Sequence, residues 1–327
     1  MSGTSKGDQE RAFYDWLPAQ LTGDMKADEL LIGLVWSLCR SGSGTGLAMT
    51  PQSYSRTLPW PGTLAGKPLR ELAEGIGSWE PFEAGVAMAA INASIIPDFS
   101  AFEHVVELPV GGGNLAVFDY FLPRIRGANI VVIGRYPGLD AYQQQYNLKV
   151  IERQPGANDY PDTAAEYLLA EADWVFITAS SIPNKTFPRL AELSGHAVSV
   201  LMGPTTPWLP QLARWGIDFL AGTIVRDELL LRRVVAEGGG KAIFDKAVSY
   251  VVADIGTARM QQVKEQIAAL AEQRDELKQQ MNAWYAAGHS KRFPLLSELE
   301  ALLGELSGLD TLYKQMWDVR QHPEVRR

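Results

Sequence analysis

The clearest indication of the fold class is the segment Asn129-Ile130-Val131-Val132-Ile133-Gly134-Arg135-Tyr136-Pro137-Gly138. A short β-branched run that ends at a glycine is typical of a buried strand leading into a tight turn. Similar apolar runs follow at residues 148–151, 174–178, 197–202 and 219–225, and helical patterns such as residues 163–170 lie between them. Continuous apolar strands that alternate with helices predict a parallel sheet covered on both faces. We therefore expect a Rossmann-like α/β domain over residues 125–256.

The residues before this domain show a different pattern. We expect one strand over residues 30–37 and a hairpin partner over residues 46–49. Pro68 fits the first turn of a following helix, and Ser78 is the predicted N-cap of the next one. Two early strands followed by helices predict a small α+β domain over residues 1–124.

The last part of the chain, residues 257–327, has the composition of long helices. Apolar residues recur at steps of three and four in two series, with Arg274 within the first. The series are Met260, Val263, Ile267, Leu270, Leu277, Met281 and Trp284, then Leu295, Leu299, Leu302, Leu306, Leu309, Tyr313 and Met316. A break containing glycine and proline separates them, which predicts an antiparallel helical hairpin. Its apolar stripe must be buried on the body of the protein or on a second copy, so a homodimer through the hairpin is one of two alternatives.

The charge of the chain is unevenly distributed. Its 327 residues include 30 basic and 38 acidic residues, a formal net charge of −8. Residues 257–327 contain 10 of each sign, so the whole excess lies in residues 1–256. An acidic chain argues against a nucleic-acid partner. No apolar run is long enough to span a bilayer, and the N-terminus lacks the apolar core of a signal peptide, so we expect no membrane partner and a cytoplasmic location.

The single cysteine, Cys39, excludes a disulfide framework, a cysteine-rich zinc site and an iron–sulfur cluster built within one chain. The four histidines are far apart in sequence, at positions 104, 196, 289 and 322. No Ser-His-Asp pattern, H-E-x-x-H motif, P-loop or C-x-x-C motif is present.

Candidate ligand-binding residues lie where the predicted strands end, because ligands of open α/β sheets bind beyond the carboxyl ends of the strands. The turn at residues 134–138 presents backbone amides to an anion, or is simply a tight turn. Glu152 ends the second strand, 18 residues after Gly134. An acid about 20 residues after such a turn often binds ribose hydroxyls. The alternative is a salt bridge from Glu152 to Arg135 or Arg153.

Other polar residues follow the later strands and one helix of the first domain. Asp162 fits a helix N-cap, whereas Asp159 has no such local role and is the better site candidate. Ser180 and Thr205 are small hydroxyl residues at strand ends. They form a polar floor for phosphate, carboxylate or a hydrated metal, or they cap helices. Asn92 either caps its helix or points into the cleft between the domains.

A linear series of motifs resembles a known family. It includes Gly46-Leu47-Ala48-Met49-Thr50, Ala84-Gly85-Val86-Ala87-Met88-Ala89-Ala90-Ile91-Asn92-Ala93, Val132-Ile133-Gly134-Arg135-Tyr136-Pro137-Gly138-Leu139, Asp159-Tyr160-Pro161-Asp162-Thr163, Asn184-Lys185-Thr186 and Met202-Gly203-Pro204-Thr205-Thr206-Pro207. Over residues 25–250 the chain is similar to the domain-of-unknown-function proteins described as "putative heavy-metal chelation". The resemblance implies an enolase N-terminal-like domain, then a Rossmann-like domain, with the ligand site in the cleft between them.

The resemblance also bears on individual residues. The positions that match its motifs are Asn92, Gly134, Pro137, Glu152, Asp159, Asp162, Asn184, Thr186, Gly203 and Pro204. The chain departs from the family at Tyr136, where phenylalanine is more usual, and in the hairpin from residue 257 onward. Together with the residues chosen at the strand ends, the predicted ligand-binding set is Asn92, Gly134, Tyr136, Pro137, Gly138, Glu152, Asp159, Asp162, Ser180, Asn184, Thr186, Gly203, Pro204 and Thr205.

The small number of cysteine and histidine residues limits which kinds of metal the chain could bind. Soft heavy metals prefer thiolate and imidazole, and one cysteine with four scattered histidines does not make a dedicated soft site. The predicted metal ligands Glu83, Glu152 and Asp159 favour harder ions, or a metal already held by an organic chelate. We expect a protein that binds or handles a divalent or transition metal, or a small-molecule metal chelate, in the interdomain cleft. The alternatives are a Rossmann-type enzyme or nucleotide-binding protein for an adenosine-containing ligand, and a scaffold that acts through the hairpin.

Overall fold

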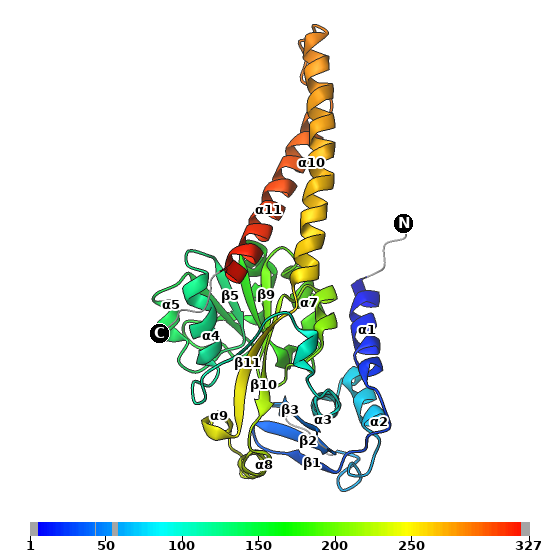
Figure 1. Cartoon of the computed structure of the whole chain (residues 1–327), viewed down its shortest axis with the longest axis vertical. Helices are drawn as coiled ribbons and strands as arrows, with labels where there is room; N and C mark the ends of the chain where they lie inside the picture. The colour runs from blue at the N-terminus through cyan, green and yellow to red at the C-terminus, as the bar shows by residue number, and fades with distance from the viewer. Residues whose placement is uncertain (1–5, 43, 54–57, 322–327) are drawn as a thin grey trace.

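The computed structural model describes residues 6–42, 44–53 and 58–321, so the predicted polar N-terminus at residues 1–5 lies outside it. The chain forms a large parallel-rich sheet, a small antiparallel sheet beside it and a C-terminal helical pair that projects away from both (Figure 1). This confirms the predicted α/β class. Among the described residues, no helix is both long and apolar enough to cross a membrane.

The large sheet contains eight strands in the order β4-β11-β10-β9-β8-β5-β6-β7. Their bounds are β4 Val105–Glu107, β5 Ile130–Ile133, β6 Leu148–Glu152, β7 Tyr160–Pro161, β8 Trp174–Thr178, β9 Val198–Met202, β10 Phe219–Val225 and β11 Val248–Asp254. The strands β6, β5, β8, β9 and β10 pair in parallel, as predicted from the apolar runs. The order β7-β6-β5-β8-β9-β10 is that of a doubly wound nucleotide-binding sheet.

Both faces of this sheet are covered, which explains why its strands are continuously apolar. Val131 and Ile133 of β5 belong to a buried cluster with residues of α6 and α7, whereas Ile130 and Val132 belong to a second cluster with α4 and the helical pair. The helices that cover the sheet or connect its strands are α4 Leu115–Phe121, α5 Asp140–Gln143, α6 Ala165–Leu168, α7 Phe187–Leu193 and α9 Ile243–Lys246. The alternation of a strand's side chains between two cores is the expected consequence of a parallel sheet buried on both sides.

Two antiparallel strands at one edge were not predicted. β11 pairs with β10, and β4 pairs with β11. β4 comes from the part of the chain that we assigned to the first domain, so the large sheet includes residues that precede the expected domain boundary at residue 124. A three-residue strand leaves almost no periodicity in a sequence, because its place depends on hydrogen bonds to a strand far along the chain.

The small sheet contains β1 Glu29–Ile32, β2 Trp36–Ser41 and β3 Gly44–Met49, all antiparallel. The single strand predicted over residues 30–37 is therefore wrong: the chain turns at Gly33, whose amide donates to the Trp36 carbonyl (3.0 Å), and returns as β2. The sheet packs on α3 Pro81–Ser94 and on α8 Glu228–Ala236. Since α8 follows β10 in sequence, the chain returns to the small sheet before it forms β11.

The helix α3 lies very close to the small sheet. A Cβ at Gly46 would come within 2.2 Å of the Ala89 carbonyl oxygen, so only glycine fits at this point of β3. The N-cap of α3 is Glu80, whose carboxylate accepts from the Glu83 amide (2.7 Å), and not Ser78 as predicted. The remaining helices of this part are α1 Lys6–Trp16 and α2 Leu69–Glu74.

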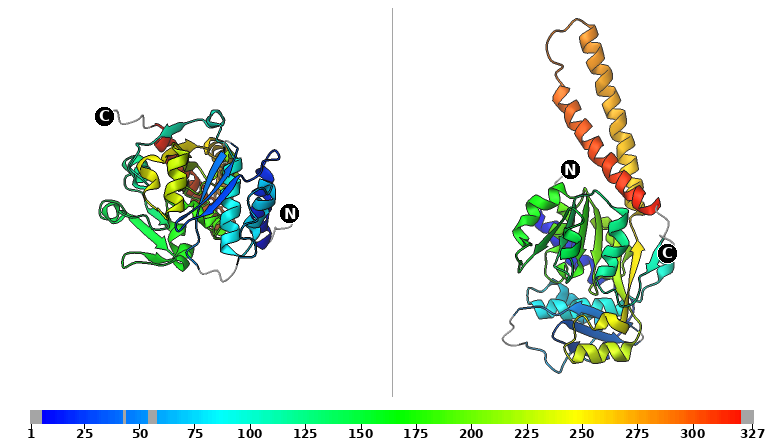
Figure 2. Two further views of the ribbon diagram at one scale, coloured as in Figure 1. Left: turned by 90° about the horizontal axis from the view of Figure 1, so that it is seen from below. Right: turned by 90° about the vertical axis from the view of Figure 1, so that its left-hand side faces the viewer.

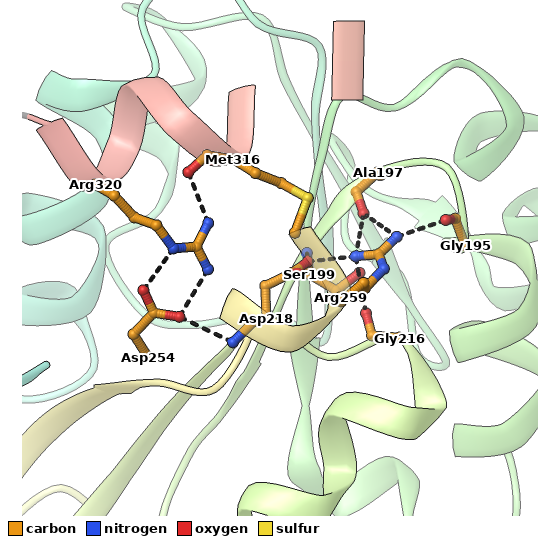
Figure 3. A network of polar contacts seen from close by, with 10 residues as sticks. Gly195, Ala197, Ser199, Gly216, Asp218, Asp254, Arg259, Met316 and Arg320 are labelled. Carbon is orange, nitrogen blue, oxygen red and sulfur yellow. Dashed lines mark hydrogen bonds and ion pairs between the residues drawn. The ribbon is translucent and has the colours of Figure 1, made fainter. Parts of the chain in front are cut away.

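The helical pair consists of α10 Thr257–Ala286 and α11 Leu296–Gln321, which confirms the predicted hairpin (Figures 1 and 2). Two buried ion pairs attach its base to the large sheet (Figure 3). Arg259 of α10 reaches Asp218, which precedes β10, at 2.5 Å. Arg320 of α11 reaches Asp254, at the end of β11, at 2.6 Å. The base of the hairpin is therefore fixed at the edge where β10 begins and β11 ends.

Candidate functional site

A cleft of about 1080 Å³ lies where β5, β6, β8 and β9 end, between the large sheet and the small one. The small-sheet side contributes residues such as Met49, Thr50 and Trp79. On the large-sheet side, β5 and β8 are neighbours. The chain continues from β5 to β6 toward one edge of the sheet and from β8 to β9 toward the other edge, so the connections that leave these two strands run in opposite directions. Ligands of doubly wound sheets bind in the crevice at this kind of reversal.

Most of the predicted ligand-binding residues line this cleft. They are Gly134, Tyr136, Pro137, Glu152, Asp162, Ser180, Asn184, Thr186, Gly203, Pro204 and Thr205. Gly138, Asn92, Asp159 and Glu83 are not among the lining residues. The cleft therefore joins strand ends that are up to about 70 residues apart in sequence, as the strand-end argument expects.

The turn after β5 is held by the carboxylate at the end of β6. Glu152 accepts from the Arg135 amide (2.8 Å) and from the Gln154 amide (3.2 Å). Within the described part of the chain Glu152 forms no salt bridge with Arg135 or Arg153, and the Arg135 guanidinium pairs with Asp140 and Asp159 instead. Gly134 has a φ of +94°, and a Cβ there would lie 3.0 Å from the Thr178 methyl group, so the turn requires glycine.

Asp159 has the local structural role that we thought it lacked. One of its carboxylate oxygens accepts from the Gly156 amide (2.8 Å), and the other pairs with Arg135. Its side chain is fully buried by these contacts. Asp159 therefore stabilises the loop after β6 and does not face the cleft.

The three predicted metal ligands do not come together. Among the described residues, no three Asp, Glu, His or Cys side chains are grouped so that they could hold a metal ion. Glu83 is exposed on the first turn of α3, and Asp159 is occupied by Arg135. Glu152 alone of the three lines the cleft. The structure does not bring the three carboxylates together, and Glu152 and Asp159 are bound by amides and a guanidinium of their own loops.

Asn92 connects the two sheets. Its side-chain amide donates to the Leu47 carbonyl of β3 (2.8 Å) and to the Thr205 carbonyl after β9 (3.0 Å). The Thr205 hydroxyl in turn accepts from the Met49 amide (2.9 Å). Asn92 therefore fixes one wall of the cleft and does not line it.

Two further residues of the cleft, Ser181 and Lys185, are not in the predicted ligand-binding set. Ser181 is 2% exposed, and its hydroxyl has no hydrogen-bond partner within the part of the chain that the structure describes. Lys185 has a φ of +65°, unusual for a residue with a side chain, and its ammonium donates to the Ile76 carbonyl (2.6 Å). Burial lowers the pKa of Lys185 to about 8. The motif Asn184-Lys185-Thr186 pointed to this loop, but no sequence pattern distinguished its lysine.

The charged lining of the cleft is mixed. It includes Arg135, Arg153, Lys185, Arg189 and Lys241 against Glu152, Asp162 and Glu166. Arg135 and Arg189 are paired with carboxylates, whereas Arg153 and Lys241 form no ion pair with any described residue. Arg153 and Lys241 are therefore lining cations that can pair with an anionic ligand without giving up a contact within the described chain.

The fold and the cleft define a two-sheet α/β protein with a large ligand pocket between the sheets. The chain belongs to the DUF364 family. A family model for DUF364, described as "Putative heavy-metal chelation", matches residues 116–254, and one for DUF4213, with the same description, matches residues 14–95. No curated protein matches the chain.

Two solved structures are similar to this chain. A DUF364 protein of unknown function from Desulfitobacterium hafniense has 30% sequence identity and a TM-score of 0.64, over 76% of this chain and 100% of its own. A DUF364 protein of unknown function from Pyrococcus horikoshii has 22% identity and a TM-score of 0.55, over 75% of this chain and 98% of its own. The second likeness concerns the fold alone.

Proposed function

We propose that the protein binds a small anionic molecule in the cleft between its sheets, and that an anionic metal chelate is the ligand class it handles. The observation that carries this proposal is that Arg153 and Lys241 line a cleft of about 1080 Å³ and form no ion pair with any described residue. Cations without a carboxylate partner at a concave site attract an anion to that place.

The side chains available as metal ligands favour a metal chelate over a bare metal ion as the molecule that the protein binds. The described residues contain no group of three Asp, Glu, His or Cys side chains that could hold a metal. Cys39 is fully buried, and burial raises its pKa to about 12, so it supplies no thiolate ligand. A metal whose charge is balanced by its own carboxylate or phosphate ligands needs basic side chains and hydrogen-bond donors from the protein. The family description of heavy-metal chelation is compatible with a protein that binds a metal already held by other ligands.

An adenosine-containing ligand is the second candidate, because the strand order is that of a Rossmann-like sheet and Glu152 ends its second strand. The turn after β5 is less favourable for an adenosine-containing ligand. The Arg135 amide is already bound by Glu152, and the following helix has four residues and begins with Asp140. A carboxylate at that position repels a phosphate.

Calorimetry with defined probes tests the proposal. We expect ferric citrate to bind, and zinc chloride alone to bind no more tightly than it binds any acidic surface. The double variant Arg153→Glu with Lys241→Glu should weaken ferric citrate binding by about tenfold, because two unpaired cations are replaced by anions. Lys246→Glu is the matched control, since Lys246 is exposed near Lys241 but is not among the cleft-lining residues.

The outcomes separate the two candidates. If ATP or NAD binds and Glu152→Ala abolishes that binding while ferric citrate has no effect, the nucleotide function replaces the chelate function. If zinc alone binds stoichiometrically and ferric citrate does not, the basic lining does not select the ligand and the proposal fails.

A further inference from the structure

The loop that follows β8, at residues 180–186, forms part of the cleft wall and is closed by hydrogen bonds of its own backbone. The Asn184 amide donates to the Ser180 carbonyl (3.1 Å), and the Thr186 amide donates to the Ser181 carbonyl (3.0 Å). Ser180, Ser181, Asn184, Lys185 and Thr186 all line the cleft. The loop is therefore a closed turn that places five polar residues at one wall of the cleft.

The Ser181 hydroxyl is a buried polar group without a partner. The residue is 2% exposed, and its Oγ forms no hydrogen bond within the described chain. The neighbouring Ser180 differs, because its hydroxyl is bound to the Thr178 hydroxyl (3.0 Å). A buried hydroxyl that lacks a hydrogen bond destabilises a fold, because it has lost water and gained no other partner. Since Ser181 lines the cleft, a ligand bound there can supply the missing acceptor.

Lys185, in the same loop, has a partly buried charge that forms no ion pair with any described residue. Its ammonium donates to the carbonyls of Ile76 (2.6 Å) and Pro183 (3.3 Å), and the centre of the Tyr14 ring lies 5.0 Å from its Nζ. These three groups are neutral. Glu83 is near enough to raise the pKa of the lysine, against the larger lowering by burial, but makes no ion pair with it. An ammonium has three donors, so one remains for a ligand.

The backbone of Lys185 is also in an unfavourable conformation. Its φ of +65° lies in the left-handed region that favours glycine, and no other non-glycine residue in the described ranges has a positive φ. Residues with a side chain in such conformations are found especially at ligand sites, where the surrounding structure holds them. Glycine would form the same closed turn without this strain, so the turn alone does not explain a lysine at this position.

We propose that Ser181 and Lys185 form the subsite that binds an oxyanion of the ligand, a carboxylate or a phosphate group, with a hydroxyl and an ammonium as its donors. The identity of the whole ligand rests on the function proposed above, whereas the subsite itself is tested separately with inorganic phosphate. Glu166, the acid that α6 brings to the cleft, is bound by Arg189 (2.8 Å), so its charge is already balanced.

Calorimetry with ferric citrate and with sodium phosphate tests the subsite. Ser181→Ala should weaken the binding of the probe by about tenfold, because a hydrogen bond to a charged group is lost. Lys185→Gln retains a donor for the Ile76 carbonyl but removes the charge, and should weaken binding by at least as much. The probe that the wild-type chain binds more tightly distinguishes a carboxylate from a phosphate as the preferred oxyanion.

Ser194→Ala is the matched control. Ser194 is also a buried serine, but its hydroxyl donates to the Leu190 carbonyl (2.7 Å), and it is not among the cleft-lining residues. The two substitutions should therefore have opposite effects. Ser194→Ala should lower the Tm and leave the affinity unchanged, whereas Ser181→Ala should weaken binding and leave the Tm unchanged or raise it.

An unchanged affinity in Ser181→Ala or in Lys185→Gln overturns the subsite. The proposed function then stands if Arg153→Glu with Lys241→Glu still weakens the binding of ferric citrate. If phosphate binds through the subsite and ferric citrate does not bind, the subsite stands and the chelate function fails. A wild-type chain that binds neither probe with a Kd below about 1 mM overturns both. A lowered Tm in Ser181→Ala shows that the hydroxyl has a partner within the chain, and also overturns the subsite.

Discussion

Removal of the Arg320 guanidinium should destabilise the attachment of the hairpin to the body. Arg320 makes a two-point ion pair with Asp254, with Nε 2.6 Å from Oδ2 and Nη2 2.7 Å from Oδ1. The two side chains are 10% and 4% exposed, so water does not readily replace the contact when one partner is lost. In Arg320→Ala, Asp254 keeps the Gly256 amide (2.9 Å) but loses its counter-charge.

The size of this effect follows from burial. Removal of one member of a buried ion pair costs about 3–5 kcal/mol, because the remaining charge stays desolvated. Arg274→Ala is the matched control within the same hairpin, since the Arg274–Asp275 pair is 31% and 59% exposed. An exposed pair contributes at most about 1 kcal/mol.

Urea unfolding and hydrogen exchange together measure the effect. We expect a lower free energy of unfolding for Arg320→Ala, faster exchange of α11 amides, or both, since the base of the hairpin can separate before the sheets unfold. The double variant Arg320→Met with Asp254→Leu should recover most of the loss, because apolar groups of similar size replace the pair. Equal unfolding energies and equal α11 exchange in Arg320→Ala and Arg274→Ala would refute the anchoring role.

Four further outcomes are expected. Burial raises the pKa of Asp218 to about 6, so its contribution to the free energy of unfolding is present below about pH 4 and is lost as the pH rises through 6. The free energy of unfolding of Asp218→Asn, measured across this pH range, should lack this decrease. Burial lowers the pKa of Lys185 to about 8, so ferric citrate affinity measured by calorimetry should fall from pH 7 to pH 9 and should fall less in Lys185→Arg. Asn92→Ala leaves two carbonyls without their donor and should cost about 1–3 kcal/mol in urea unfolding. Gly134→Ala places a methyl group 3.0 Å from Thr178 at a φ of +94°, and thermal denaturation should show a loss of about 1–3 kcal/mol.

The parallel strands and the hairpin were predictable because their signals are local. Residues 130–133 and 174–177 are apolar at every position, since both faces of their sheet are buried. The heptad spacing in residues 257–327 likewise reports a helical pair directly. In contrast, the turn at Gly33 divides one apolar run into two strands, and its hydrogen bond to Trp36 leaves no distinct pattern.

Many of the residues that line the cleft were predictable from the sequence, but the contacts that their side chains make were not. Strand-end residues such as Gly134 and Thr205 line the cleft because the topology of an open sheet places strand ends together. The role of Asp159 was misjudged because its partner, Arg135, lies 24 residues earlier, and sequence spacing does not show such a pairing. Lys185 was overlooked because its burial and its φ depend on the packing of the loop after β8.

Composition and periodicity are enough to predict the alternating strands and helices, the hairpin, and the concentration of negative charge in residues 1–256. Which charges meet depends on the fold. The fold pairs Asp159 with Arg135 and Asp254 with Arg320, and it gives Arg153 and Lys241 at the cleft no ion pair with any described residue. The physical reason is that burial patterns repeat over a few residues, whereas an ion pair depends on two side chains that the fold brings together from distant positions. The place of these two cations at the cleft is therefore a property of the fold.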